Sequence, residues 1–311
     1  MGWEGGGVNK IEFGDCRETM RRWKEQGIKA QTCVTSPPYF GLRDYGHEGQ
    51  LGLEETPEDY IKAMVEVFRC VWDVLEDNGT LWLNIGDSYA GSGKGPAGNL
   101  GASNDERNMT HTKSSSLVPK NCKPKDLIGI PWLLAFALRA DGWYLRQDII
   151  WHKPNPMPES VTDRCTKAHE YIFLMSKSPK YYYDADALKE PVENMGKPRK
   201  FRDGDPSATL RNDDGRMYIP KEDRNKRSVW TVNTKPYAGA HFAVFPTELI
   251  EPCILAGAPV GGIVLDPFMG SGTTAQVAQN LGRQYIGCEL NPAYFDLQNI
   301  RTAQQSFGFE A

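Results

Sequence analysis

Two short segments of this sequence carry residue types suited to chemistry, although 227 positions separate them. The first is Thr35-Ser36-Pro37-Pro38-Tyr39, in which consecutive prolines fix φ and remove two backbone donors just before an aromatic side chain. The second is Asp266-Pro267-Phe268-Met269-Gly270-Ser271-Gly272-Thr273-Thr274, which places an acid and glycines between a predicted strand and a predicted helix. We interpret them as a pair, in which a rigid turn holds one reactant and a glycine loop holds the other.

The second segment has the order with which doubly wound folds hold a nucleotide-like ligand: strand, acid, glycine loop, helix. Gly270 and Gly272 allow the backbone to approach a ligand, because glycine lacks a Cβ and tolerates positive φ. Glu289 ends the next predicted strand 23 residues after Asp266, about where such folds place an acid on ribose hydroxyls. The loop has no lysine to meet a triphosphate, so the pattern predicts a ribose-bearing cofactor. The alternative is that Gly270 and Gly272 only form a tight turn between a strand and a helix. That interpretation does not explain the acid at Glu289.

The first segment is suited to hold the exocyclic amino group of a nucleic-acid base. That amino group is a poor nucleophile, because its lone pair is delocalised into the ring. Hydrogen bonds from its two N–H groups to the Ser36 hydroxyl and the Pro37 carbonyl would localise the lone pair during attack on a methyl group. Tyr39 would stack on the base after it is flipped out of the duplex. A rigid loop without function is the alternative, and the predicted position just past a strand favours a site.

Composition excludes several classes of protein. The chain has 311 residues, 40% hydrophobic and 11% aromatic, which is typical of a folded globular protein and argues against a disordered chain. A formal net charge of −4 argues against a uniformly basic DNA-coating protein. The seven cysteines lie at least 17 residues apart, so no zinc-finger spacing exists, and we expect no metal and reduced thiols in the cytoplasm. No apolar run approaches the roughly 18 residues of a membrane span, so no membrane partner is expected.

The remaining periodicity predicts an α/β fold with a Rossmann-like, doubly wound, mostly parallel sheet. Strands are expected at about residues 10–15, 30–35, 80–85, 144–151, 170–176, 262–266 and 284–288, and helices at about 16–26, 56–75, 130–139, 246–256, 273–281 and from 292 onward. If the strands that precede Ser36 and Asp266 are neighbours at the switch point of the sheet, the two segments meet in space.

Two stretches interrupt this rhythm. Residues 92–125 are rich in small polar residues and carry six Lys or Arg against two acids, which predicts a mobile basic loop. Residues 185–235 carry twelve Lys or Arg against nine acids and few aliphatic residues. We interpret them as an insertion in a catalytic domain that is formed by residues 1–184 and 236–311.

At this point the chain resembles the β class of DNA amino-methyltransferases, in which the Ser-Pro-Pro-Tyr block comes early and the Asp-Pro-Phe-x-Gly-Ser-Gly-Thr-Thr block comes late. The resemblance covers nearly the whole chain. It implies a circularly permuted class I methyltransferase fold, S-adenosyl-L-methionine as cofactor, and methylation of adenine N6 or cytosine N4. It also implies that the 185–235 insertion recognises the DNA target, and that double-stranded DNA is the partner.

The resemblance assigns roles residue by residue. It places Ser36, Pro37, Pro38 and Tyr39 in the catalytic turn. It places Glu289 on the ribose hydroxyls, Asp15 near the adenine of the cofactor, and Phe245 and Pro246 near its methionine part. The full set expected at the cofactor is Asp15, Thr35, Phe245, Pro246, Asp266, Pro267, Phe268, Gly270, Ser271, Gly272, Thr273, Glu289 and Asn291.

Basic residues of the insertion and near the base pocket are candidate DNA contacts. They are Arg43, Lys153, Arg199, Lys200, Arg202, Arg211, Arg216, Arg224, Lys226 and Arg227, for each of which a solvated surface role is the alternative.

The target base stays open at this point. Ser36 is associated in the family more with cytosine N4, whereas the block that extends from Tyr39 to Gly46 is associated with adenine methylases, and we favour adenine. RNA, a protein glutamine, or an inactive DNA-binding relative are further alternatives. The recognition sequence, a homodimer and a restriction partner are not fixed by these residues.

Overall fold

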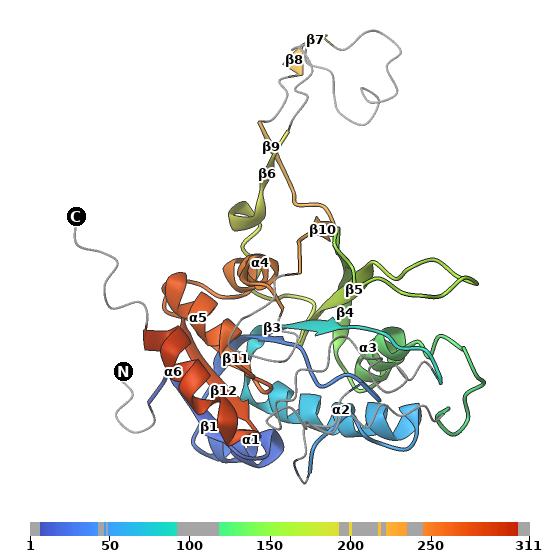
Figure 1. Ribbon diagram of the computed structural model, residues 1–311. Coiled ribbons are helices and arrows are strands. Elements are labelled where there is room, and N and C mark those ends of the chain that lie inside the picture. Colours follow the sequence, from blue (N-terminus) through green and yellow to red (C-terminus); the bar gives the residue numbers. More distant parts are fainter. Residues whose placement is uncertain are drawn as a thin grey trace. The chain divides into compact units, whose positions relative to one another are not determined.

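The computed structural model describes residues 7–42, 47, 49–91, 118–192, 199–200, 217–218, 222–234 and 245–303 (Figure 1). Most of the predicted basic loop, from 92 to 117, lies outside the described residues, as do Arg43, Arg202, Arg211 and Arg216. No helix in the described part is long and apolar enough to cross a membrane.

An eight-stranded sheet forms the centre of the main unit. Its strand order is β1-β12-β11-β2-β3-β5-β4-β10. The strands are β1 (Lys10–Phe13), β2 (Ala30–Thr35), β3 (Leu75–Ile85), β4 (Tyr144–His152), β5 (His169–Ser176), β10 (Val229–Thr231), β11 (Ile263–Asp266) and β12 (Gln284–Glu289). Every neighbouring pair is parallel except the two pairs made by β5. The predicted mostly parallel, doubly wound sheet is confirmed.

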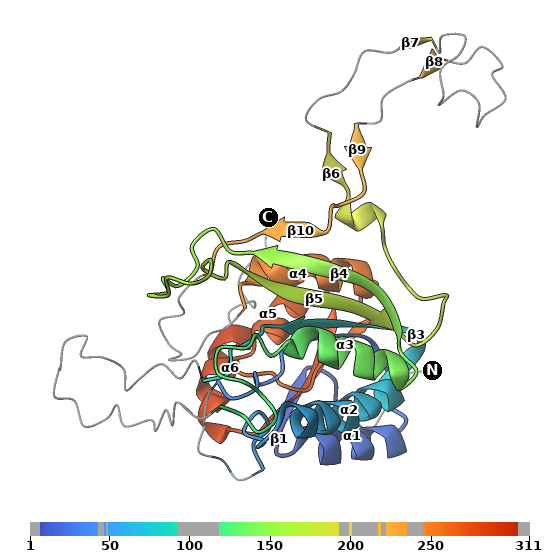
Figure 2. The same ribbon diagram turned by 90° about the vertical axis from the view of Figure 1, so that its right-hand side faces the viewer.

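Helices cover both faces of this sheet (Figures 1 and 2). One layer consists of α1 (Cys16–Glu25), α2 (Pro57–Val74) and α3 (Ile130–Ala140), and the other of α4 (Thr247–Gly257), α5 (Thr273–Asn280) and α6 (Phe295–Ala303). A 3-10 turn, η3 (Pro292–Tyr294), precedes α6. Because both faces are covered, consecutive residues of a central strand can all be buried, as Leu81, Trp82 and Leu83 of β3 illustrate.

The strand order explains how the two ends of the chain build one half of the sheet. β11 and β12 come from the C-terminal part and are flanked by β1 from the N-terminal part, whereas β2 and β3 begin the other half. The chain therefore changes winding direction between β11 and β2, which is the switch point where doubly wound folds bind ligands. This is the permuted order that the resemblance implied.

Local sequence signals account for where helix α2 begins, but not for where the strand after it begins. Thr56 caps the helix by accepting a hydrogen bond from the Asp59 amide at 3.1 Å, and Pro57 occupies the first turn. We expected the helix to end at about residue 75 and the next strand to begin at about residue 80. Instead the helix ends at Val74, and the 11-residue strand β3 begins at the next residue and includes Asn78-Gly79. Neighbouring atoms leave no space for a Cβ at Gly79.

A second compact unit spans Ala185–Arg227. It contains a 3-10 turn, η2 (Asp186–Leu188), and two antiparallel ribbons. One ribbon pairs β6 (Glu190–Pro191) with β9 (Asp223–Arg224), and the other pairs β7 (Arg199–Lys200) with β8 (Met217–Tyr218). The unit is shorter than the insertion that we inferred at 185–235, because β10 belongs to the main sheet and pairs in parallel with β4 through Val229 and Ile150.

Candidate active site

The two segments singled out in the sequence meet at the carboxyl edge of the sheet. β2 ends at Thr35 and β11 ends at Asp266, and these strands are direct parallel neighbours. The Thr35 hydroxyl donates a hydrogen bond of 2.6 Å to Oδ1 of Asp266, across 231 positions of sequence. The turn that begins with Ser36 and the loop that begins with Pro267 therefore leave the sheet side by side.

Asp266 ties this junction together from inside the protein. Its side chain is only 1% exposed, and it accepts hydrogen bonds from the Thr35 and Thr274 hydroxyls at 2.6 Å and from the Phe268 amide at 3.0 Å. Burial raises the pKa of Asp266 to about 6, although these three donors act to lower it. The carboxylate thus fixes the shape of the glycine loop and its neighbour, and faces away from solvent.

Acids also follow the next two strands, so that β11, β12 and β1 end in a row of carboxylates. Glu289 closes β12, where it is 9% exposed and accepts the amides of Gly270 at 2.7 Å and Asn291 at 2.8 Å. Burial raises the pKa of Glu289. Asp15 follows β1 and caps α1 by accepting the Arg17 amide at 2.7 Å, and the Arg17 guanidinium, bound to the same carboxylate, lowers the pKa of Asp15.

The glycine loop has the shape expected of a ligand-binding loop. Gly270 has φ +53° and no atom closer than 4.0 Å to the position of a Cβ, so open space lies beside its backbone. Gly272 has φ +89° and begins α5. Between them, the Ser271 hydroxyl is buried and has no hydrogen-bond partner among the described residues. An open backbone, an unpaired buried hydroxyl and a carboxylate at the end of β12 fit a ribose-bearing cofactor.

Other residues predicted for the cofactor lie at the same edge or support it. Asn291 caps η3 by accepting the Ala293 amide at 2.9 Å. The Thr273 hydroxyl accepts a hydrogen bond of 2.6 Å from buried Arg301. Phe268 is half-buried against the hydrophobic core, and Pro267 is buried. Phe245 and Pro246 precede α4, which runs back to the amino end of β11, so they also lie at the carboxyl edge.

The catalytic turn leads into a polar network that the sequence did not predict. The Tyr39 hydroxyl donates to Oε2 of Glu170 at 2.7 Å, and Oγ of Ser36 lies 3.5 Å from the same hydroxyl. The Asn84 amide donates to Glu170 at 3.3 Å, and Lys153 forms an ion pair with the other carboxylate oxygen. Burial raises the pKa of Tyr39 well above its ordinary value, so the hydroxyl stays protonated and can donate.

Tyr39 is also held by packing. A Cβ on Gly86 would lie 2.7 Å from the Tyr39 ring, so only glycine fits where β3 leaves the sheet. On the preceding residue, the Pro38 carbonyl accepts a hydrogen bond of 2.9 Å from Tyr60. The Pro38 carbonyl is thereby occupied by the protein, whereas the acceptors inferred for a base amino group belong to Ser36 and Pro37.

Asn84 and Glu170 are site residues that sequence reasoning missed. Asn84 is a buried polar residue that follows the apolar run Leu81–Leu83 of β3, and Glu170 lies at the start of β5. A polar residue near the end of a buried strand was the available signal. Lys153, a candidate DNA contact, pairs with Glu170 and lies 4.2 Å from the centre of the Trp151 ring.

The predicted DNA contacts that fall on described residues belong mostly to the second unit. Arg224 and Arg227 both donate to Oε1 of Glu190, at 3.0 and 2.6 Å. Arg199 and Lys200 form β7, and Lys226 follows β9. Within the described residues there is no group of three or more side chains that could hold a metal ion.

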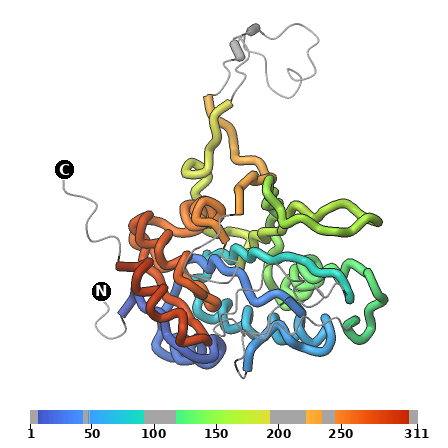
Figure 3. Tube along the Cα trace, viewed as in Figure 1, coloured from blue at the N-terminus to red at the C-terminus, as the bar shows by residue number. Residues whose placement is uncertain are grey.

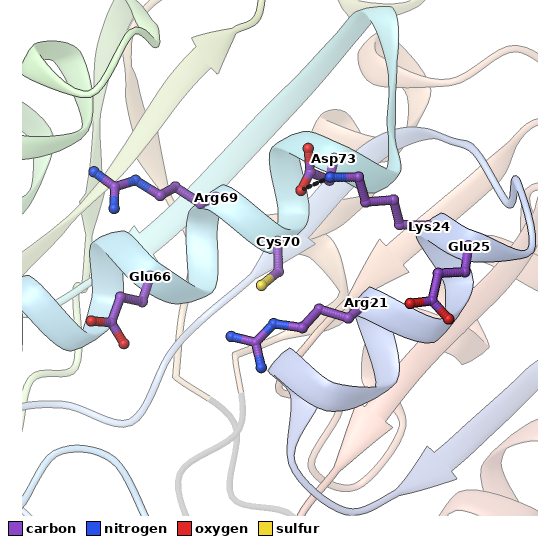
Figure 4. Close-up of a pocket in the computed structure, with 7 residues that line it drawn as sticks. All are labelled: Arg21, Lys24, Glu25, Glu66, Arg69, Cys70 and Asp73. Atoms are coloured by element: carbon purple, nitrogen blue, oxygen red, sulfur yellow. Dashed lines mark hydrogen bonds and ion pairs between the residues drawn. The ribbon is translucent and has the colours of Figure 1, made fainter.

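A hollow of about 660 Å³ lies elsewhere, between α1 and α2 (Figure 4). Its lining is mixed in charge and includes an ion pair of 2.8 Å between Lys24 and Asp73. Burial raises the pKa of Cys70, which also lines it, so the thiol is poorly reactive. None of the residues predicted for the site borders this hollow, so we do not take it as the active site.

Comparison with known proteins decides the family. A family model for N6 and N4 methylation, described as DNA methylase, matches residues 30–300. The chain belongs to this DNA methylase family. It is an S-adenosyl-L-methionine-dependent DNA amino-methyltransferase, as the two segments and their meeting at the switch point indicated.

Relatives of similar length support this assignment. The chain is 49% identical to the type II methyltransferase M.SmaI of Serratia marcescens, over 94% of this chain and 90% of the relative. It is 48% identical to M.Cfr9I of Citrobacter freundii, over 91% and 84%. Among solved structures, a PvuII DNA methyltransferase described as cytosine-N4-specific aligns with a TM-score of 0.62 at 18% identity, over 98% of this chain and 92% of that chain. The latter likeness concerns the fold.

Proposed function

We propose that this DNA methyltransferase transfers a methyl group to the N4 amino group of a cytosine that is flipped out of the duplex. The observation that carries the proposal is the junction of Thr35 and Asp266, which places the Ser36 turn beside the glycine loop. A base held by the turn and a cofactor held by the loop would then face each other at one edge of the sheet.

The chain's own residues supply positioning and hydrogen-bond acceptors. S-adenosyl-L-methionine, when bound, supplies a methyl group on a positively charged sulfur. The amino nitrogen of the base donates its hydrogens to Ser36 Oγ and to the Pro37 carbonyl, which localises its lone pair. Ser36 and Pro37 would hold the nitrogen with its lone pair facing the methyl group that the cofactor would supply, and the proton that the amino group gives up would pass to solvent. Asp15, Glu289 and the unpaired Ser271 hydroxyl would orient the cofactor.

Flipping is required by geometry, because the amino group of a paired base is engaged within the helix. Tyr39 would stack on the ring of the flipped base. Its hydroxyl is held by Glu170, which fixes the orientation of the ring. A ring whose orientation is fixed beforehand lowers the cost of accepting the base.

Ser36 favours cytosine over adenine as the target. In the family that the chain resembles, adenine-specific members often carry Asp at this position, and serine is associated more with cytosine N4. The block that favoured adenine in the sequence runs through residues 43–46, which lie outside the described residues, so the structure adds nothing to it. We therefore place cytosine N4 first and keep adenine N6 as the alternative.

Mass spectrometry of nucleosides tests the proposal. Unmethylated genomic DNA is incubated with the protein and S-adenosyl-L-methionine carrying a deuterated methyl group, then digested to nucleosides. We expect labelled N4-methylcytosine. Labelled N6-methyladenine would overturn the choice of base and leave the enzyme class intact, whereas no labelled nucleoside would contradict methylation of DNA.

The unit Ala185–Arg227 is proposed as the target-recognition region. It is compact and it carries Arg199, Lys200, Arg224 and Arg227 on or beside its short strands. Alanine variants of these residues should bind the cofactor normally and methylate DNA with weaker or relaxed sequence preference. Unchanged sequence preference across the set, measured by sequencing the methylated positions, would refute this role.

A further inference from the structure

The loop between β4 and β5, residues 153–168, projects outward from the ends of these two strands (Figures 1 and 3). Its two ends close on each other, because the Lys153 amide donates to the Ala168 carbonyl at 2.8 Å. The same ends carry the Lys153–Glu170 ion pair, and Glu170 holds the Tyr39 hydroxyl. The loop therefore starts at the residues that position Tyr39.

The loop presents an apolar side chain to solvent. Met157 is 73% exposed, and Val161 further along the loop is 39% exposed. A single exposed hydrophobic residue is ordinary on a protein surface. Met157 differs because the chain around it is stiff: prolines at 154, 156 and 158 fix φ on both sides and restrict Met157 itself to extended conformations. The backbone therefore has little conformational entropy left to lose if this side chain is inserted into a partner.

Polar contacts on both arms hold the loop in place. Asn155 exchanges hydrogen bonds with Thr234, accepting its amide at 3.0 Å and donating to its carbonyl at 3.1 Å. On the returning arm, the guanidinium of Arg164 lies 3.8 Å from the centre of the Tyr89 ring. Asp163 pairs with Lys125 at 2.6 Å. A loop anchored on two sides with an apolar residue between the anchors is built to present that residue.

A short segment connects Met157 to the residues that hold Tyr39. Met157 follows Lys153 by four positions, and an extended segment of that length spans at most about 14 Å. Lys153 pairs with Glu170, which holds the Tyr39 hydroxyl. When a base leaves the stack it leaves a gap, and proteins fill such gaps with apolar wedges that include methionine. The charge of the loop does not oppose DNA, because Lys153, Arg164 and Lys167 outnumber Glu159 and Asp163.

We propose that Met157 is a wedge that enters the DNA stack where the target base has been flipped out. The inference rests on the proposed flipping of the base and adds the residue that stabilises the opened duplex. It predicts that Met157 matters for opening a paired base and matters less when the base is already unpaired.

The test compares two duplex oligonucleotides that contain a sequence which the wild-type protein methylates. In one the target base is paired, and in the other an abasic site faces it, which removes most of the cost of flipping. We expect Met157→Ala to lower kcat/KM on the paired duplex by about tenfold and to lower it much less on the abasic one. Met157→Leu should restore most of the loss, because it keeps an apolar side chain of similar size.

Val260→Ala serves as the matched control. Val260 is 76% exposed, but it lies just before β11, at the amino end of the sheet, away from the site. It should leave both substrates unaffected. An equal loss for Met157→Ala on both duplexes, or no loss on either, would overturn the wedge. Failure of the wild-type protein to methylate any DNA would instead contradict the proposed function.

Discussion

The Thr35 hydroxyl lies 2.6 Å from Oδ1 of Asp266 and joins the last residue of β2 to the last residue of β11. These two strands begin the two halves of the sheet, so the bond spans the switch point. Its partners are buried, and loss of the hydroxyl would leave the carboxylate with one donor fewer in a dry environment.

Thr35→Val should therefore weaken both stability and catalysis. The side chain keeps its shape but no longer donates, and we expect the free energy of unfolding to fall by about 1–3 kcal/mol. Cofactor affinity should fall as well, because the glycine loop loses a tie to β2. Thr35→Ser keeps the hydroxyl and serves as the control. Urea unfolding and calorimetric titration with S-adenosyl-L-methionine measure the two effects, and equal behaviour of the valine and serine variants would argue against the bond.

Asp266 should also give stability a specific dependence on pH. Burial raises the pKa of Asp266 from 3.8 to about 6, so the folded protein binds this proton more tightly than the unfolded chain. The stability that the protonated group contributes is fully present below about pH 4 and is lost as the pH rises through about 6.

Asp266→Asn removes this titration. Between about pH 4 and about pH 6, the wild-type protein should lose up to about 3 kcal/mol more of its free energy of unfolding than the variant does. Glu289 is present in both proteins, and the charge of Asp266 is only one of the smaller causes of its raised pKa, so most of its titration cancels in the comparison. Parallel curves of unfolding free energy against pH for the two proteins would show that Asp266 does not titrate in this range.

The bond between Tyr39 and Glu170 leads to a prediction of coupling. Tyr39→Phe removes the hydroxyl, and Glu170→Gln removes the negative charge that holds it. If Glu170 acts by positioning Tyr39, the two losses in kcat should overlap, so that the double variant is little worse than either single variant. Single-turnover methylation with the cofactor saturating measures these rates. Fully multiplicative losses would mean that Glu170 serves a separate purpose.

A variant control separates positioning from stability in this network. Glu170→Gln leaves Lys153 without its partner near the Trp151 ring, which can lower stability without affecting Tyr39. Lys153→Met in the Glu170→Gln background removes that unpaired charge. It should recover thermal stability and leave the methylation rate low.

The sequence predicted the junction because its signals are local. A strand, an acid and a glycine loop can each be recognised within a few residues, and the rule that ligands bind at the switch point brings two such signals together. Thr35 and Asp266 end their strands as expected. What the local pattern did not predict is the inward orientation of the Asp266 carboxylate, because burial depends on what packs around the loop.

The Tyr39–Glu170 contact could not be predicted in this way. It joins residues 131 positions apart, through an antiparallel strand placed between β3 and β4, and nothing in the local pattern sets that order. Strand β10 was not predicted for another reason. Val229–Thr231 is only three residues long and lies next to a basic, polar stretch. Its place in the sheet comes from pairing with β4 rather than from its own periodicity.

The most direct test measures cofactor affinity and methyl transfer in two variants, Asp266→Ala and Tyr39→Ala. It asks whether the glycine loop binds the cofactor while the turn at Ser36 to Tyr39 binds the base at the same edge of the sheet. We predict that Asp266→Ala loses binding of S-adenosyl-L-methionine, and transfer with it, because the glycine loop loses the carboxylate that shapes it. Tyr39→Ala should bind the cofactor as the wild-type protein does and should transfer the methyl group poorly. Equal loss of cofactor affinity in both variants would contradict the assignment of the glycine loop to the cofactor and of the Ser36 to Tyr39 turn to the base.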